Sequence, residues 1–233
     1  MLKEATAVGE HSSLALQEGI ILTDKTIVQA VKKALDKAKK RNFRETVDLS
    51  VNLKDVDLSV PKNRIQEDII LPHGRGKDVK ICVIGGGELA LKAKNVADRV
   101  ITPEELAKLA DNKKEAKRIA AQYDYFIAEA PLMPTIGKRL GMVLAPRGKM
   151  PRPIPPGADP KPMIESLRKT ISVRSRDKRT FHAPVGTVDM TPEQIADNIE
   201  EVLKRVSSKL ERGMMNIGSA YVKTTMGPSE KVK

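Results

Sequence analysis

The sequence predicts an α/β protein of two domains, one of which is split by the insertion of the other. Two clusters of proline and glycine interrupt the 233 residues, one at residues 72–76 and a denser one at residues 146–157, and such clusters mark loops between structural units. Between the clusters, short apolar strands alternate with helical segments, which is typical of a small parallel sheet of the Rossmann-like kind. Outside them, both ends of the chain show the mixed patterns of an α+β domain.

The N-terminal part is expected to contain one helix and two strands. Apolar residues recur at helical spacing between residues 27 and 38, with lysines between them. In residues 47–53 every second residue is Val or Leu and the others are polar, which is the pattern of a strand with one buried face. Residues 65–71 are expected to form the strand that pairs with it.

The inserted domain is expected to span residues 72–155, which leaves residues 1–71 and 156–233 to the split domain. Its strands are predicted at residues 80–84, 99–101 and 123–128. Thr102 and Glu105 form a capping box that begins the helix after the second of these strands. The two neighbouring linkers between the domains are expected to act as a hinge.

The returning part of the split domain is predicted to begin with a helix after Asp159 and to continue with strands at residues 171–175 and 180–187. Thr191 and Gln194 form a second capping box, and the helix that follows carries its apolar residues on one face. A last strand is expected to run to Lys223.

The composition indicates a polyanionic partner. The chain has 42 Lys and Arg against 30 Asp and Glu, a formal net charge of +12, so nucleic acid is expected ahead of a membrane surface. No apolar run approaches the roughly 18 residues of a membrane span, and the first 22 residues do not have the pattern of a signal peptide. Three Phe, three Tyr and no Trp supply few rings for base stacking, which favours a folded RNA recognised by phosphates, ribose hydroxyls and shape.

No cofactor and no metal ion are predicted. Cys82, the single cysteine, lies in an apolar strand and is expected to be buried. His11, His73 and His182 lie far apart in the sequence, and none has a Cys or a second His at ligand spacing.

The strongest enzymatic alternative is a glycine-rich run over residues 85–90, which formally matches the dinucleotide-binding pattern G-x-G-x-x-G/A. A tight turn between strand and helix also needs glycine, and Glu88 would repel a pyrophosphate from the helix start. Dinucleotide binding therefore stays the weaker interpretation.

The C-terminal tail is the most informative segment of the sequence. After the alternating Ala220 and Val222, the chain reads Thr224, Thr225, Met226, Gly227, Pro228. Pro228 is expected to stop the strand, and Gly227 allows another backbone to approach closely. Both threonine hydroxyls are then expected to face outward and bond ribose and phosphate oxygens, with Met226 covering a sugar or base. A frayed strand end is the alternative interpretation.

Two basic clusters are further candidates for RNA contact. The first includes Arg41 and Arg44 around Phe43, whose ring is costly to expose unless a partner covers it. The second leads through Arg179 to His182. Each cluster by itself is also compatible with a solvated surface. Residues 72–154 carry 16 Lys and Arg against 9 Asp and Glu, so the inserted domain is a further candidate to contact RNA.

Five segments resemble, in order, the universal large-subunit ribosomal protein L-one family in its archaeal form. They are FRETV at 43–47, LPHGRGK at 71–77, APRGKMP at 145–151, HAPVG at 182–186 and VKTTMGP at 222–228. The resemblance runs from about Asp24 to Ser229 and implies the split two-domain arrangement. It also implies an RNA-binding set, here Phe43, Glu45, Thr46, Ser219, Thr224, Thr225, Met226 and Gly227, with Arg41, Arg44, Arg179 and His182 as a second group.

In function, the resemblance implies a cytoplasmic, non-enzymatic protein that is monomeric when free of the ribosome. Such a protein would bind large-subunit ribosomal RNA at the mobile stalk and assist release of deacylated tRNA from the exit site. It would also repress translation of its own mRNA. Residues 1–23 fall outside the resemblance. A DNA-binding architectural protein is a second alternative, and residues that read ribose disfavour it.

Overall fold

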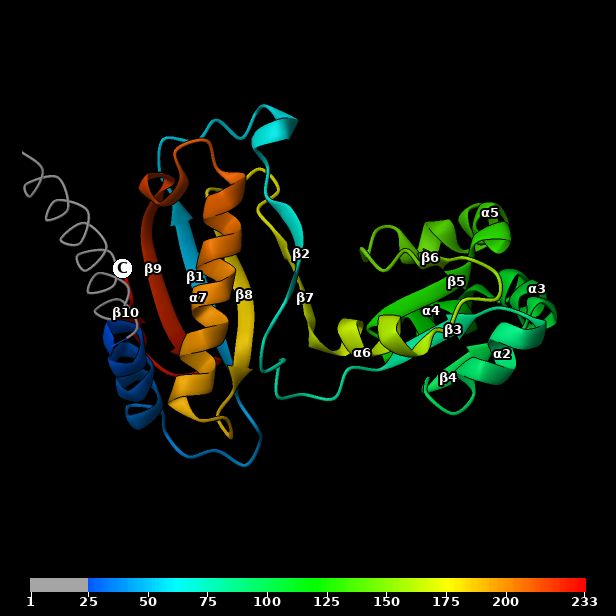
Figure 1. Cartoon of the computed structure of the whole chain (residues 1–233), viewed down its shortest axis with the longest axis horizontal. Helices are drawn as coiled ribbons and strands as arrows, with labels where there is room; N and C mark the ends of the chain where they lie inside the picture. The colour runs from blue at the N-terminus through cyan, green and yellow to red at the C-terminus, as the bar shows by residue number, and fades with distance from the viewer. Residues whose placement is uncertain (1–24) are drawn as a thin grey trace, which may run out of the picture. The chain divides into compact units, whose positions relative to one another are not determined.

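The computed structural model describes residues 25–233 (Figure 1). Residue contacts divide the chain into a split unit, which ends at Lys77 and resumes as Thr170–Lys233, and an inserted unit, Asp78–Lys169. The two-domain α/β class predicted from the sequence is confirmed. The sequence placed the divisions after residues 71 and 155, whereas the contacts place them after residues 77 and 169. The predicted extension over residues 1–23 lies outside the described residues.

The main sheet of the split unit is antiparallel and has the strand order β10-β9-β1-β8. These strands are β1 (Thr46–Leu53), β8 (Thr180–Thr187), β9 (Ile217–Thr224) and β10 (Ser229–Lys231). β9 ends before Pro228, which was expected to stop this strand, and β10, which was not expected from the sequence, then adds a further strand to the sheet. Pro228 lies in the turn that reverses the chain, where it need not donate to the ladder, and the N–H of Val232 then bonds the carbonyl of Ala220 at 2.8 Å.

One strand pairing expected from the sequence is wrong. β2 (Gln66–Ile70) does not pair with β1 but forms a separate two-stranded sheet with β7 (Thr170–Arg174). Both edges of β1 are occupied by β8 and β9. Asp55, with φ of 56°, and the 3-10 helix Pro61–Asn63 lie on the path between β1 and β2, so the chain does not return directly as a hairpin.

Two helices bury one face of the main sheet. The first covers residues 25–36, and the second is α7 (Pro192–Lys209), which begins at the predicted capping box of Thr191 and Gln194. α7 crosses β9, β1 and β8 in Figure 1. Val47, Leu49, Val51 and Leu53 of β1 pack in one core with the apolar faces of both helices.

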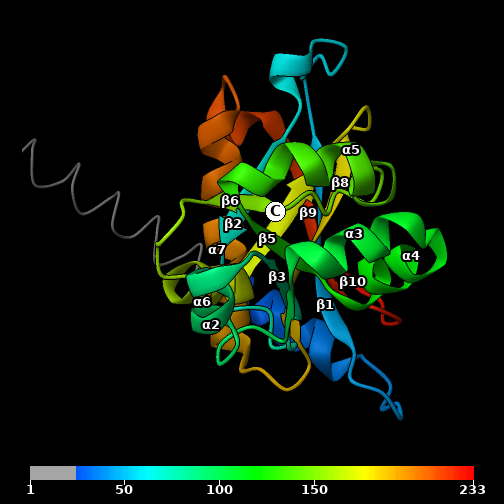
Figure 2. The same ribbon diagram turned by 90° about the vertical axis from the view of Figure 1, so that its right-hand side faces the viewer.

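The inserted unit has a parallel sheet with the order β4-β3-β5-β6 and helices on both faces (Figure 2). Its strands are β3 (Ile81–Ile84), β4 (Arg99–Ile101), β5 (Tyr125–Glu129) and β6 (Arg152–Ile154). Its helices are α2 (Gly87–Ala93), α3 (Pro103–Asp111), α4 (Lys113–Gln122), α5 (Met133–Leu144) and α6 (Lys161–Lys169). Residues from α2 and α6 pack on one face, and residues from α3, α4 and α5 on the other.

α6 explains why the second boundary differs from the expected one. Ile164 and Leu167 are fully buried, and they pack with Ile81 and Val83 of β3 in a core of the inserted unit. The proline cluster at residues 146–157 therefore lies inside the inserted unit, between α5 and α6. No helix within residues 25–233 is both long and apolar enough to cross a membrane.

Candidate RNA interface

The main sheet presents a polar face on the side away from the helices. Along β1 the buried residues alternate with the partly exposed Thr46, Asp48, Ser50 and Asn52. The neighbouring strands bring polar partners to the same face, since side chains directly opposite each other share a face of a sheet. His182 of β8 and Tyr221 of β9 lie opposite Ser50, and Lys223 lies opposite Asp48. These strand residues, together with Arg75 of the first linker, are called the polar face.

Thr46 is the first residue of β1, directly after the first basic cluster, and it is hydrogen-bonded to Thr225. The N–H of Thr225 donates to the carbonyl of Thr46 at 2.9 Å, and the Thr225 hydroxyl donates to the same carbonyl at 3.1 Å. The hydroxyl also accepts from the N–H of Thr46 at 3.3 Å. A hydroxyl has one proton and two acceptor lone pairs, so the exposed Thr225 side chain keeps one lone pair for a donor such as a ribose hydroxyl.

Glu45 is placed differently from the expectation that it bonds ribose. Its side chain is buried, and both carboxylate oxygens have protein partners. Oε1 pairs with Nε of Arg41 at 3.2 Å, and Oε2 accepts from the N–H of Met226 at 3.1 Å. A carboxylate that accepts from a backbone N–H fixes that backbone strongly. Glu45 thus positions the turn over residues 225–228.

Thr224 is the residue whose predicted orientation is wrong. It has no exposed surface, and its hydroxyl has no hydrogen-bond partner in the described part of the chain. The alternation of β9 turns it to the helix side, like Val222, whereas Lys223 is partly exposed on the polar face. A Cβ added to Gly227 would lie 2.3 Å from Oγ1 of Thr224. The glycine is therefore required by contact within the protein, a reason that the sequence did not reveal.

We expect Gly227→Ala to weaken folding by roughly 1 to 3 kcal/mol, as overpacking does. Thr224→Ala removes a buried hydroxyl that has no partner and should change stability by less than about 1 kcal/mol. The double variant should then recover most of the loss, which thermal unfolding of the three variants measures as a coupling energy. If Gly227→Ala is equally destabilising in the Thr224→Ala background, the contact does not explain the glycine.

Two apolar side chains near this end are exposed. Phe43 is 55% exposed and Met226 is 59% exposed, and the N–H of Met226 is held by Glu45, two residues after Phe43. Arg44 pairs with the exposed Asp189 and Arg41 with Glu45. The first basic cluster is thus partly neutralised, while its aromatic ring remains open to a partner.

Ser219 and Arg179 lie at the other end of the sheet. Ser219 is opposite Asn52 and accepts from its side-chain amide at 2.8 Å, while Thr180 donates to the amide oxygen of Asn52 at 2.7 Å. Ser219 and Thr224 are five positions apart along β9, which is roughly 17 Å at 3.3 Å per residue. The sequence-predicted residues therefore form two groups, one at each end of the polar face, with His182 between them.

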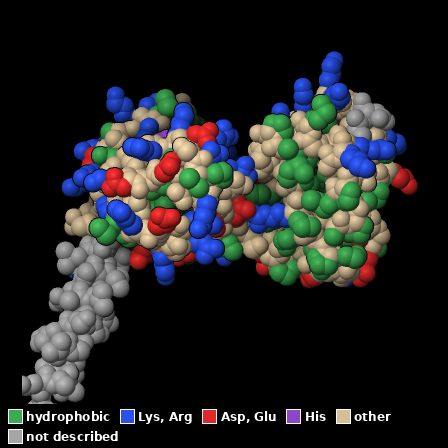
Figure 3. Space-filling model, turned by 90° about the horizontal axis from the view of Figure 1, so that it is seen from above, with side chains coloured by type: hydrophobic (Ala, Val, Ile, Leu, Met, Phe, Trp, Pro, Cys, Tyr) green, Lys and Arg blue, Asp and Glu red, His purple; other side chains and the backbone are tan. Residues whose placement is uncertain are grey.

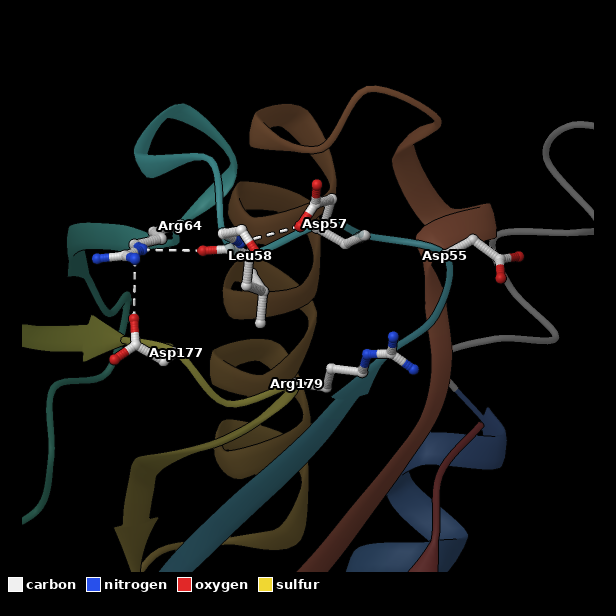
Figure 4. Close-up of a pocket in the computed structure, with 8 residues that line it drawn as sticks. Asp55, Asp57, Leu58, Arg64, Asp177 and Arg179 are labelled. Carbon is white, nitrogen blue, oxygen red and sulfur yellow. Dashed lines mark hydrogen bonds and ion pairs between the residues drawn. The ribbon is translucent and has the colours of Figure 1, made fainter.

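A hollow of about 800 Å³ lies beyond the Ser219 end, between the loop after β1 and the turn before β8 (Figure 4). Arg64 bonds Asp177 at 2.9 Å and the carbonyl of Leu58 at 3.0 Å. Arg179, at the margin, makes no ion pair within residues 25–233. The hollow is lined by three carboxylates and two guanidinium groups, so its interior is unsuited to a polyanion, and Arg179 is its one cation available to a phosphate.

Several residues of the polar face were missed by the sequence reasoning. They are Asp48, Ser50, Asn52, Tyr221 and Lys223. The signal was present, because the same alternation that predicts the buried positions of β1 and β9 also assigns these positions to the opposite face. Figure 3 shows Lys and Arg side chains distributed over both units, with acidic side chains among them on the split unit.

The glycine-rich run after β3 has structural reasons for its composition. A Cβ on Gly85 would lie 2.5 Å from Cδ2 of Leu89, and Gly87 has φ of 51°. The helix that follows, α2, has only seven residues. Among the described residues, no three His, Cys, Asp or Glu side chains gather as a metal site would require. Burial raises the pKa of the Cys82 thiol to about 12, so this thiol is not an activated nucleophile.

Comparison with known proteins identifies the family. The sequence model of the Ribosomal protein L1p/L10e family matches residues 14–228, beginning earlier than the resemblance noted from the motifs. The large ribosomal subunit protein uL1 of Methanocella arvoryzae is 56% identical over 209 residues, which are 89% of this chain and 98% of that protein. The uL1 protein of Thermoplasma acidophilum is 55% identical over 207 residues, which are 89% of this chain and 95% of that protein. The uL1 protein of Archaeoglobus fulgidus is 52% identical over 214 residues, which are 91% of this chain and 100% of that protein.

These identities extend over both units, and they confirm the expectation of a non-enzymatic protein of the large ribosomal subunit. The chain therefore belongs to the ribosomal protein L1p/L10e family, in its archaeal form.

Proposed function

We propose that the polar face and the turn over residues 225–228 bind large-subunit ribosomal RNA. The observation that carries this proposal is the pairing of β1 with β9, which brings Thr46 and Thr225 to one sheet end beside the exposed Phe43 and Met226. Neutral hydroxyls, backbone groups and two apolar side chains suit ribose and base surfaces rather than phosphates alone. The names of the relatives support the large subunit as the partner.

Each group of residues has a distinct part in the proposed mechanism. Thr225 offers its free lone pair to a ribose hydroxyl, and Phe43 and Met226 cover a sugar or base. Lys223, His182 and Arg179 lie along the sheet toward its other end and would follow the phosphate backbone. Recognition of this kind depends on the shape of a folded RNA.

The finer parts of the function are further proposals from the family resemblance. The rRNA site would be the mobile stalk near the tRNA exit site, and the chain would assist release of deacylated tRNA, with the basic inserted unit as the candidate tRNA contact. Binding of the same surface to a similar fold in its own mRNA would repress translation. The chain would act as a monomer when free of the ribosome.

Competition between matched nucleic acids tests the proposal. The protein should bind an rRNA stalk fragment, and the DNA of the same sequence should compete poorly, because the contacts include ribose hydroxyls. Log affinity should fall with log salt by about 0.7 to 0.9 per neutralised phosphate. Equal competition by DNA would favour a DNA-binding architectural protein, and tight binding of a nicotinamide cofactor would favour the dinucleotide alternative.

A further inference from the structure

The side of the inserted unit that carries α5 has exposed apolar side chains. Met142 of α5 is 78% exposed, and Met150, in the loop after α5, is 41% exposed. Pro134, Ala145 and Pro146 are exposed on the same helix and the same loop. α5 lies on the upper side of this unit in Figure 1, and Figure 3 shows that side, with hydrophobic side chains over it and most Lys and Arg at its margin. Gathered apolar side chains mark an interaction site, whereas single exposed ones are ordinary.

Two glycines of α5 leave room beside Met142 that no described residue fills. Gly137 and Gly141 are one helical turn apart, and Ala145 follows at the same spacing, so the three share a flank of the helix. A Cβ added to either glycine would have no described heavy atom within 4 Å, whereas Gly227 is required by a contact inside the protein. Glycine weakens a helix relative to alanine, and small residues let a second helix approach closely. The glycines of α5 therefore suit a partner rather than the packing of the described residues.

The charges on α5 and on the loop after it have one sign. Residues 130–157 contain five Lys and Arg and no Asp or Glu, in a chain that has 30 acidic residues. Lys149 donates to the carbonyl of Tyr123 at 2.7 Å, which ties the loop to the C-terminal end of α4. Lys138 and Arg139 are exposed on α5, and they make no hydrogen bond or ion pair with any of the described residues. The segment thus offers two unpaired cations on a fixed surface, and the complement of that surface is acidic.

We propose that this surface binds an amphipathic helix of another protein that has acidic residues along its edges. The surface, called the α5 face, is made of Gly137, Gly141 and Met142 with the neighbouring Lys138 and Arg139. The apolar side of the partner helix would pack on the glycines and on Met142, whose flexible side chain adapts to a partner. Its acidic side chains would pair with the two free cations. The inference goes beyond the proposed function, because the α5 face lies in the unit that holds none of the residues assigned to rRNA recognition.

Other occupants fit the α5 face less well. Proteins contact nucleic acids largely at the phosphates, and a surface for phosphates would have cations where the α5 face has Met142 and two glycines. A second copy of the chain would bring two faces of the same positive charge together, which is unfavourable. An acidic helix with an apolar side satisfies both the charges and the apolar area of the α5 face.

Titration of the full chain with a synthetic helical peptide tests the proposal. The peptide has about 20 residues, which is long enough for an isolated helix, with Ala and Leu on one side and Glu along both edges. In NMR spectra of the backbone amides, the signals of Gly137, Gly141 and Met142 should shift, and the signal of Leu91 should not. The same peptide with Lys in place of Glu should bind roughly tenfold more weakly or worse.

Met142→Glu and Leu91→Glu are a matched pair of variants. The parent residues are 78% and 73% exposed, but Leu91 belongs to α2, on the opposite face of the sheet from α5. Met142→Glu should lower the affinity for the acidic peptide roughly tenfold, and Leu91→Glu should leave it unchanged. Replacing Gly137 and Gly141 together by Gln should also lower the affinity, while the melting temperature stays the same or rises because Gln favours helix over Gly. The melting temperature thus separates lost binding from lost folding.

The inference is wrong if the α5 signals do not shift, if the acidic and basic peptides bind equally, or if both Glu variants lower the affinity alike. It is also wrong if the α5 signals shift with protein concentration alone, which would indicate a second copy as the occupant. An RNA hairpin of unrelated sequence that shifts these signals at lower concentration than the acidic peptide would likewise overturn it in favour of nucleic acid. Met142→Glu should bind the rRNA stalk fragment as the parent does, and failure of the parent to bind that fragment would contradict the proposed function only.

Discussion

Asn198→Ala is expected to destabilise the split unit by roughly 3 to 5 kcal/mol. Asn198 lies on α7 with no exposed surface, and its side-chain amide makes three hydrogen bonds to the backbone. It accepts from the N–H of His73 at 3.1 Å and donates to the carbonyls of Gly74 and Val185 at 2.9 Å and 2.8 Å. Each buried group left unpaired costs about 1 to 3 kcal/mol.

Denaturant unfolding of the full chain measures this loss, and the neighbouring Asp197→Ala is the control. Asp197 pairs with the His73 side chain at 2.8 Å, but both groups are partly or largely exposed, so its loss should cost under about 1 kcal/mol. A cost below about 1 kcal/mol for Asn198→Ala would show that the amide does not hold the linker to α7.

The same contacts change the interpretation of the hinge. The two linkers, which contain the proline and glycine clusters, are expected from the sequence to act as a hinge, but Gly74 is held by Asn198, and Gly76 packs against Thr187 and Met190. Gly148 lies inside the inserted unit, where its N–H bonds the carbonyl of Ala145 at 2.9 Å. Glycine content indicates where a backbone can turn, but it does not reveal which turns are fixed by hydrogen bonds from distant residues.

Much of the fold could be predicted because its signals are local. The alternation in β1, the two capping boxes and the short apolar strands of the inserted unit give elements close to those observed. The pairing of β2 with β7 and the packing of α6 depend on contacts between residues far apart in the chain, so nearby sequence favoured the wrong partner and the wrong boundary. The sequence could have indicated that Asn198 is buried and hydrogen-bonded, because it is a polar residue on the apolar face of α7.

The candidate site could be located from the sequence, but the direction of each side chain could not. Thr224 and Thr225 are adjacent and chemically alike, yet the first is buried and the second exposed. Their roles are decided by where β9 ends and by the partners of Thr225, both of which require the register of β1 against β9. Glu45 and Asp48 differ for the same reason, since burial and available partners depend on the assembled sheet.

The split unit alone is expected to bind ribosomal RNA nearly as tightly as the intact chain, within about threefold, because every residue assigned to recognition lies in it. Ile70 is opposite Thr170 in the pairing of β2 with β7, and the chain from Ile70 to Lys77 spans at most roughly 25 Å, so a flexible linker of about eight residues can join Lys77 to Thr170. Cutting at residues 71 and 156, as the sequence suggested, would instead leave α6 with its apolar Ile164 and Leu167 exposed. Circular dichroism and thermal unfolding would verify that the joined unit is folded.

Protection mapping of large-subunit ribosomal RNA by the intact chain and by the joined split unit tests the central claim most directly. We expect one discrete protected region, the same nucleotides with both proteins, and loss of protection when unlabelled stalk RNA is added. Absence of a discrete region with the folded intact chain, or protection that disappears when only the inserted unit is removed, would contradict the assignment of rRNA binding to the polar face and the turn over residues 225–228.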